Sequence, residues 1–162
     1  MPRVKKEPTA GSGLTNPVKE ATAWGLVGMT LAEAIEQSGR IYIIGNGGSY
    51  ANAQHICNDL LACGIRAFTM DSATLSAFAN DHGWENALAL WVATVGESGD
   101  LLLALSGSGK SPNILNAIAV AEKLGMLVYR IFGNERGEGM QEAEEMQLTI
   151  GHMARLCLLR KT

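Results

Sequence analysis

Residues 40–49 read RIYIIGNGGS, an apolar run followed directly by a turn of small residues. Residues 101–111 show the same arrangement and read LLLALSGSGKS. Each turn leads into a stretch with helical character. A strand, a glycine-rich turn and a helix N-terminus together make an anion site, because unpaired backbone N–H groups point outward and the helix dipole favours negative charge. The two loops therefore predict that a phosphorylated small molecule binds between them.

The composition is that of an ordinary globular protein with no sign of a nucleic-acid partner. The chain has 162 residues, of which 47% are hydrophobic and 18% charged, and its formal net charge is −3. We assign residues 1–16 to a flexible leader and residues 17–162 to a single domain. No apolar run reaches the roughly 20 residues that a membrane span needs. Three cysteines without a CxxC pair favour a reduced, cytoplasmic protein.

Apolar strands alternate with helices along the chain. The pattern predicts a doubly wound α/β sandwich: a parallel sheet with helices on both faces, in a flavodoxin-like three-layer arrangement with an additional N-terminal helix. Ligands bind such folds at the carboxyl ends of the strands, where both loops fall. The expected strands are residues 40–44, 66–70, 101–105, 127–132 and 146–150, and the expected helices are residues 17–39, 49–63, 74–79, 84–95, 112–124, 138–145 and 152–159.

The N-terminal helix has apolar residues on more than one narrow stripe. They include Trp24, Leu26, Met29 and Leu31. Such a helix is buried on two sides, which indicates a subunit interface, or it packs only on its own sheet. The sequence leaves both alternatives open.

Two nucleotide-binding folds fit the loops less well. Residues 104–111 read ALSGSGKS, a loose match to the P-loop, but Ala104 stands where that turn prefers glycine. No later strand ends in an aspartate suited to Mg²⁺. The first loop lacks the spacing of G-x-G-x-x-G, because its last position is Tyr50. We therefore expect no nucleotide cofactor.

Three motifs in order resemble a known family. Residues 45–55 read GNGGSxxxAxH, similar to the first motif of sugar isomerase (SIS) domains. Residues 79–83 resemble the A-N-D-x-G segment of that family, and residues 106–113, SxSGxSxN, resemble its phosphate-binding motif. Within the superfamily, residues 17–152 resemble the phosphoheptose isomerases most closely. The resemblance implies the SIS fold and an aldose–ketose isomerase of phosphosugars.

The loops supply the expected substrate contacts. Serine hydroxyls at a helix start are good phosphate donors, and backbone N–H groups with polar side chains can hold sugar hydroxyls. The other interpretation of the second loop is a helix cap on a flexible turn. The resemblance implies the same binding roles and adds two contacts at the middle motif. The candidate substrate-binding residues are Asn46, Gly47, Gly48, Ser49, Asn80, Asp81, Ser106, Gly107, Ser108 and Ser111.

His55 and Asp59 lie four residues apart on the helix after the first loop and therefore share one face. A histidine and a carboxylate at that spacing can bind a metal, act as an acid–base pair or form a surface hydrogen bond. In phosphoheptose isomerases these positions are His and Glu, and the resemblance implies a zinc-associated site with the carboxylate as catalytic base. Asp59 is one methylene shorter, and a displacement of about 1 Å can lower the rate about 10²-fold.

The C-terminal part departs from the family pattern, which has a Gln-Glu-x-x-His segment between the last strand and a helix with a second histidine. Here the expected strand Met146–Ile150 runs almost directly into His152. The Gln-bearing segment is therefore expected to be missing, with Gln147 on the strand. His152 matches the helix histidine, which implies a general acid and metal ligand; a structural role is the alternative.

The implied reaction converts sedoheptulose 7-phosphate to D-glycero-D-manno-heptose 7-phosphate, a lipopolysaccharide precursor. The implied catalytic residues are Asp59, His152 and His55, which also form the implied Zn²⁺ site. The resemblance further implies a homotetramer with shared active sites. The alternative is a non-catalytic SIS protein that binds phosphosugars as a regulator or assembly partner. The shortened C-terminal part favours that alternative, and His55 opposes it.

Overall fold

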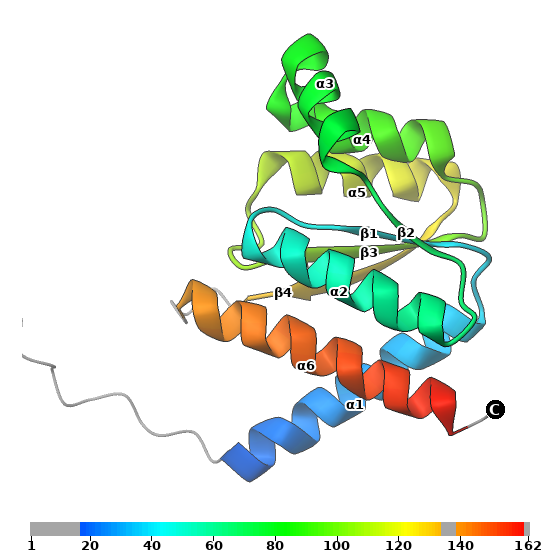
Figure 1. The fold of residues 1–162 in the computed structure, drawn as a ribbon, viewed down its shortest axis with the longest axis vertical. Coiled ribbons are helices and arrows are strands. Elements are labelled where there is room, and N and C mark those ends of the chain that lie inside the picture. Colours follow the sequence, from blue (N-terminus) through cyan, green and yellow to red (C-terminus); the bar gives the residue numbers. More distant parts are fainter. Residues whose placement is uncertain (1–16, 134–138, 161–162) are drawn as a thin grey trace, which may run out of the picture.

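Four parallel strands form the central sheet of the computed structural model, which describes residues 17–133 and 139–160 (Figure 1). The strands stand in the order β2-β1-β3-β4. Their side chains are mostly apolar, since helices cover both faces of the sheet. The four strands predicted before residue 133 are confirmed to within a residue at each end. Their bounds are β1 Ile41–Ile44, β2 Ala67–Thr69, β3 Leu101–Ser106 and β4 Leu127–Phe132.

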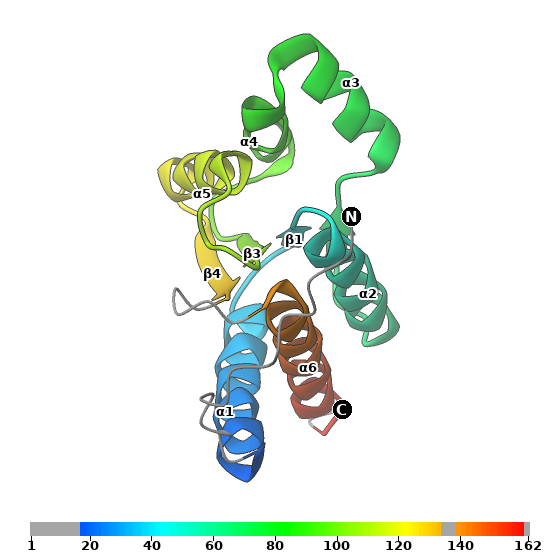
Figure 2. The same cartoon turned by 90° about the vertical axis from the view of Figure 1, so that its left-hand side faces the viewer.

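Helices connect the strands and complete the layers on either side of the sheet (Figures 1 and 2). Pro112 occupies the first turn of α5, where a residue without an N–H is tolerated. Gly125 ends that helix in the left-handed conformation with a φ of +77°. The predicted α/β class with an N-terminal helix is confirmed. The bounds are α1 Pro17–Glu36, α2 Gly48–Ala62, α3 Ser72–His82, α4 Trp84–Val95, α5 Pro112–Leu124 and α6 Met140–Leu159.

Alternate side chains of the strands enter two separate cores. Ile43 and Leu103 pack with residues of α1, α2 and α6, whereas Tyr42 and Leu102 pack with residues of α4 and α5. Successive side chains of a strand point to opposite faces, so each strand serves both cores. Figure 2 shows the same division, with α4 and α5 on one side of the sheet and α1, α2 and α6 on the other.

The prediction of a strand at residues 146–150 is wrong, because this stretch lies in the middle of α6. The helices expected on either side of it belong to the same continuous helix. The stretch reads MQLTI, which taken alone has strand propensity. Its helical character appears only over a longer window. The buried residues then recur at spacings of three or four: Ala143, Gln147, Ile150, Ala154 and Leu158.

α1 packs along α6 and leaves some of its apolar side chains uncovered. Leu31 and Ile35 are buried in the core, whereas Leu26 and Met29 are 60% and 50% exposed. In the part of the chain that the structure describes, no helix is long and apolar enough to span a membrane. The predicted leader, residues 1–16, lies outside the described residues, and the single domain stays a prediction.

Candidate functional site

The first glycine-rich loop turns the chain sharply from β1 into α2. Gly47 is the N-cap residue of α2, with a φ of +54° that glycine adopts without strain. Gly45 has no room for a side chain, because a Cβ there would overlap the backbone carbonyl of Ser49. The tight turn places the N-terminus of α2, with its backbone N–H groups, at the carboxyl edge of the sheet.

The second loop is held in shape by its own serines. The Ser106 hydroxyl oxygen accepts a hydrogen bond from the Gly109 N–H at 3.0 Å, and the Ser108 hydroxyl oxygen accepts one from the Lys110 N–H at 3.2 Å. Ser111 is the N-cap residue of α5 by position, yet its side chain makes no capping hydrogen bond. The Ser111 hydroxyl is therefore available to a ligand rather than used as a helix cap.

A pair of asparagines ties the two loops together. The Asn46 amide donates to Oδ1 of Asn113 at 2.9 Å, and the Asn113 amide donates back to Oδ1 of Asn46 at 2.8 Å. Oδ1 of Asn113 also accepts from the Ile114 N–H at 3.0 Å. Asn113 is buried at the start of α5. This reciprocal pair fixes the spacing between the N-termini of α2 and α5.

α2 and α6 run side by side in the same direction (Figure 1). They meet along a line of mostly polar residues, which we call the polar seam. The Asn52 amide donates to the backbone carbonyl of Glu144 at 2.8 Å and to Oε1 of Gln147 at 3.2 Å. Contacts recur at each turn because positions three or four apart share one helix face. The polar seam comprises Gly48, Asn52, His55 and Asp59 on α2, and Glu144, Gln147, His152 and Arg155 on α6.

Three ionisable side chains converge in the polar seam. Nε2 of His55 and Nε2 of His152 are 3.0 Å apart. Oδ2 of Asp59 lies 3.7 Å from the first nitrogen and 3.6 Å from the second. The two imidazoles are about half exposed, whereas the Asp59 side chain is 15% exposed. The structure thus brings the three predicted catalytic residues together where α2 and α6 meet.

The same three atoms have the geometry of a cation site. Ligand atoms about 2.0–2.1 Å from a tetrahedral Zn²⁺ lie about 3.3 Å from one another. The separations between the atoms of His55, Asp59 and His152 are 3.0, 3.6 and 3.7 Å. Two imidazoles and one carboxylate are donors that zinc accepts, with a fourth position left open. The residues therefore fit the implied ion.

Two more charged side chains of the polar seam lie beside these groups. Nε of Arg155 is 3.8 Å from Oδ1 of Asp59, the carboxylate oxygen that does not face the imidazoles. At the other end, the Glu144 carboxyl group lies against Gly48, where a Cβ would overlap it. A hollow of about 210 Å³ opens between Asn52 and Glu144. The polar seam therefore runs from the first loop to the ionisable cluster.

Gln147 lies in the polar seam and not on a strand. Its side chain is fully buried, and its Oε1 accepts the hydrogen bond from Asn52. Its Nε2 is buried without a hydrogen-bond partner among the described residues. The expectation that Gln147 stands on a strand outside the site is wrong, because α6 begins well before it and turns it toward α2.

Asn80 and Asp81 lie apart from the two loops. Both are exposed near the end of α3, where the Asn80 amide donates to Oδ1 of Asp81 at 2.8 Å. α3 extends away from the sheet (Figures 1 and 2). The chain by itself therefore does not bring these two predicted substrate contacts to the polar seam.

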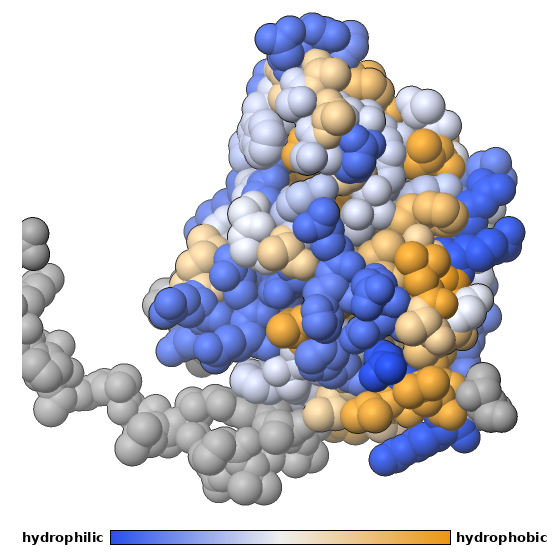
Figure 3. Space-filling view, viewed as in Figure 1, coloured by the Kyte–Doolittle hydropathy of each residue, from blue (hydrophilic) through white to orange (hydrophobic). Residues whose placement is uncertain are grey.

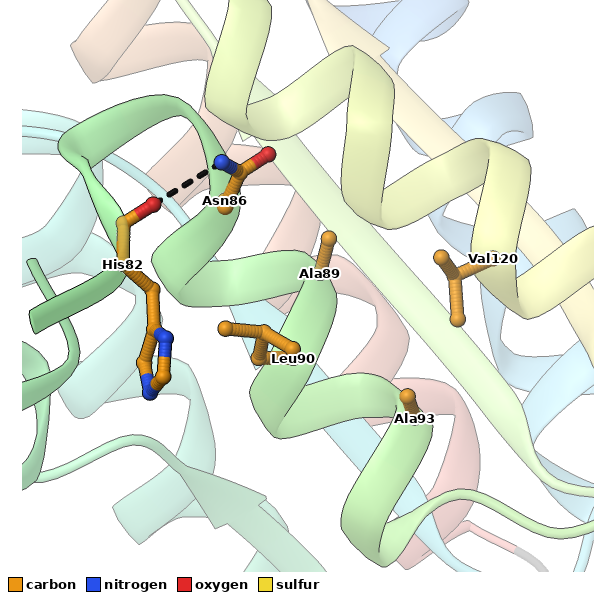
Figure 4. A pocket seen from close by; sticks show the side chains of 6 residues that line it. All are labelled: His82, Asn86, Ala89, Leu90, Ala93 and Val120. Atoms are coloured by element: carbon orange, nitrogen blue, oxygen red, sulfur yellow. Dashed lines mark hydrogen bonds between the residues drawn. The ribbon is translucent and has the colours of Figure 1, made fainter.

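A second hollow lies on the other side of the sheet, between α4 and α5 (Figure 4). It has a volume of about 340 Å³ and is larger than the hollow at the polar seam. Its lining is mostly apolar, with one imidazole and one amide, and it includes no residue of either glycine-rich loop. We therefore place the candidate site at the loops and the polar seam. The residues lining this second hollow are His82, Asn86, Ala89, Leu90, Ala93 and Val120.

Three residues of the site were not predicted as such from the sequence: Asn113, Glu144 and Arg155. Asn113 is the last position of the phosphate-binding motif. Arg155 follows His152 by three residues, a spacing that puts both on one helix face. For Glu144 there was no such signal, because the expected strand at residues 146–150 separated it from the helix that carries His152.

Known proteins are similar in sequence to this chain over most of its length. The SIS domain family profile matches residues 18–133. A phosphoheptose isomerase from Alkalilimnicola ehrlichii is 34% identical over 143 residues, which are 83% of this chain and 70% of that protein. Phosphoheptose isomerase 1 from Campylobacter jejuni is 41% identical over 123 residues, which are 70% of this chain and 64% of the relative. The chain therefore spans about two thirds of the length of these curated relatives.

Two solved structures share the fold. The phosphoheptose isomerase from Francisella tularensis has a TM-score of 0.81 and 27% identity, covering 89% of this chain and 90% of that one. The phosphoheptose isomerase from Neisseria gonorrhoeae has a TM-score of 0.81 and 24% identity, covering 88% of this chain and 91% of that one. The arrangement of the sheet and its helices is thus that of the solved phosphoheptose isomerases.

Proposed function

Because the chain belongs to the SIS domain family and, within it, to the phosphoheptose isomerases, we propose that it interconverts sedoheptulose 7-phosphate and D-glycero-D-manno-heptose 7-phosphate. The main observation behind the proposal is the polar seam, which runs from the glycine-rich loops to a carboxylate beside two imidazoles. An isomerase of phosphosugars needs both parts, an anchor for the phosphate and a proton-transfer pair at a fixed distance from it.

The second loop and the N-terminus of α5 bind the phosphate in this proposal. Ser106, Ser108 and Ser111 supply hydroxyl donors, and the helix N-terminus supplies backbone N–H groups and a favourable dipole. The uncapped Ser111 side chain supports this role. The first loop, held to the second by Asn46, binds the sugar hydroxyls through residues 46–49.

The proposed reaction moves one proton between neighbouring carbon atoms. Oδ2 of Asp59 accepts the proton from the carbon beside the carbonyl, while His152 donates a proton to the carbonyl oxygen, and a cis-enediol forms. Asp59 then returns its proton to the former carbonyl carbon. His152 recovers a proton from the oxygen that becomes the new carbonyl, so no atom is gained or lost. His55, 3.0 Å from His152, orients that imidazole.

We propose Zn²⁺ as the cofactor. His55, Asp59 and His152 would hold the ion, which when bound polarises substrate oxygens. The low exposure of Asp59 supports its part, because a shielded carboxylate exchanges its proton with water less readily than an exposed one.

We also propose that the protein is a cytoplasmic homotetramer and that its product is a lipopolysaccharide precursor. Leu26 and Met29 on α1 and Leu156 on α6 are 60%, 50% and 45% exposed. Exposed large apolar side chains on packed helices are typical of protein interfaces, and apolar surface gathers near the C-terminal end of α6 (Figure 3). In a shared site, Asn80 and Asp81 serve the polar seam of a neighbouring subunit.

A coupled assay of the full chain with sedoheptulose 7-phosphate, with and without added zinc, tests the proposal. Wild type is expected to convert the sugar, and Asp59→Asn to lose about 10²–10⁴-fold in rate, the range for a general base. Calorimetry should show the same sugar-phosphate affinity for Asp59→Asn and wild type. Glu142→Gln, the same type of change on an exposed position of α6, is the matched control. Binding by wild type without conversion would instead support the non-catalytic regulator.

A further inference from the structure

Arg155 approaches Asp59 from the side opposite the imidazoles. Its Nε lies 3.8 Å from Oδ1 of Asp59, whereas Oδ2 faces His55 and His152 at 3.7 and 3.6 Å. The two oxygens of one carboxylate therefore have different partners. One oxygen faces a fixed positive charge, and the other faces the candidate cation site.

The Arg155 nitrogen that faces Asp59 is shielded from water. Nε is buried and has no hydrogen-bond partner among the described residues, although 38% of the side chain is exposed. A buried N–H without a partner is unfavourable, so its position calls for a compensating interaction. The Asp59 carboxylate is the charge that compensates it, because the guanidinium group brings a positive charge to this position.

We propose that Arg155 is a positioning residue that sets the cation affinity of the cluster formed by His55, Asp59 and His152. It holds Oδ1 and so turns Oδ2 toward the imidazoles. Its charge also balances Asp59 when no ion is bound and opposes a divalent cation at the same carboxylate. The site therefore binds its ion more weakly than the same three ligands would without Arg155. This inference rests on the cation site of the proposed function.

The size of the effect follows from charge and exposure. The cluster holds one carboxylate and two imidazoles, and Arg155 offsets that single negative charge. For a partly exposed pair the effective dielectric lies between those of protein and water, so loss of the arginine charge should tighten cation binding by about tenfold. Salt screens such an effect, and the difference should therefore shrink as the ionic strength rises.

Cobalt binding to the chelator-treated full chain tests the inference without any substrate. Co²⁺ is titrated into each protein, and its visible absorption reports both affinity and coordination. The neutral variants Arg155→Gln and Arg155→Met should bind Co²⁺ about tenfold more tightly than wild type, and Arg155→Lys, which keeps the charge, should stay near wild type. Arg160→Gln removes the same charge from the exposed C-cap residue of α6 and should leave the affinity unchanged. His152→Ala should lose the absorption band, which locates the ion.

Two results would overturn the inference. Equal or weaker cobalt binding in both neutral variants would mean that Arg155 does not oppose the ion. No cobalt binding in wild type or in either neutral variant would mean that the three ligands do not form a cation site. Two neutral replacements are used so that one poorly folded variant does not decide the outcome. The sugar-phosphate conversion assay is independent of both results, so failure of this inference is distinguishable from failure of the proposed function.

Discussion

Replacing Asn113 by alanine removes the link between the two glycine-rich loops. Its side chain makes three hydrogen bonds, two with Asn46 and one with the Ile114 N–H. At a net contribution of about 1 kcal/mol per bond, Asn113→Ala should lower the free energy of unfolding by about 3 kcal/mol. Asn46→Ala removes only the two bonds of the pair and should lower it by about 2 kcal/mol.

The double variant tests whether the two asparagines act as a unit. Either single replacement already removes both bonds of the pair, so the double variant should lose about 3 rather than about 5 kcal/mol. Urea unfolding at one protein concentration measures these values, and a slope of about 2 kcal/mol/M places the Asn113→Ala midpoint about 1.5 M lower. The control is Asn116→Ala, on the same helix, whose amide donates to the Glu85 carbonyl; it should show no coupling with Asn46.

The same link predicts a selective kinetic effect. Since the asparagine pair spaces the loops and does not touch the ionisable cluster, Asn113→Ala should raise KM for the sugar phosphate more than it lowers kcat. Losses that add to within about 0.5 kcal/mol in the double variant would refute the pairing. An unchanged KM would refute the claim that the pair sets the spacing of the binding loops.

Three further predictions follow from other positions. Gly48→Ala should leave the melting temperature nearly unchanged, because the new Cβ meets only the flexible end of the Glu144 side chain. Gly45→Ala should lower the melting temperature, because the new Cβ meets the backbone of Ser49. Thermal unfolding of the two variants and wild type measures the difference. Hydrogen bonds at the α3 N-cap lower the pKa of Asp71 below its ordinary 3.8. The contribution of Asp71 to stability is therefore complete above pH 3.8 and is lost as the pH falls through the lowered pKa. The stabilities of wild type and Asp71→Ala, measured as the pH is lowered, should converge there. Burial raises the pKa of Cys57, so this thiol should react with a disulfide reagent slowly in the native protein and quickly in urea.

The strands could be predicted from the sequence because local pattern and surroundings agree there. Residues 41–44 and 101–105 are continuous apolar runs, and each is followed by a glycine-rich turn that ends the strand. The prediction for residues 146–150 was wrong because their strand propensity is local. The spacing of the α6 residues that pack on α1 and α2 becomes visible only over the whole helix. Tertiary packing outweighed propensity in that segment.

Site residues could be predicted from the sequence where they lie on the same helix at a spacing that puts them on one face. His55 and Asp59 share a face of α2 by their spacing alone, and His152 was found through the family resemblance. The contact of Arg155 with Asp59 depends on how far α6 is shifted along α2, which no local pattern records. The pairing of Asn46 with Asn113 likewise depends on β1 and β3 being neighbours in the sheet.

The polar seam joins a helix that follows β1 with a helix that follows β4. A growing chain that has been synthesised as far as Gly133 contains all four strands of the sheet and both glycine-rich loops, but only the α2 half of the seam. Contacts between segments so distant in sequence form late, because a long loop must close first. The two glycine-rich loops and the ionisable cluster of His55, Asp59 and His152 are therefore completed at different moments of synthesis, and the docking of α6 on α2 brings them into one site.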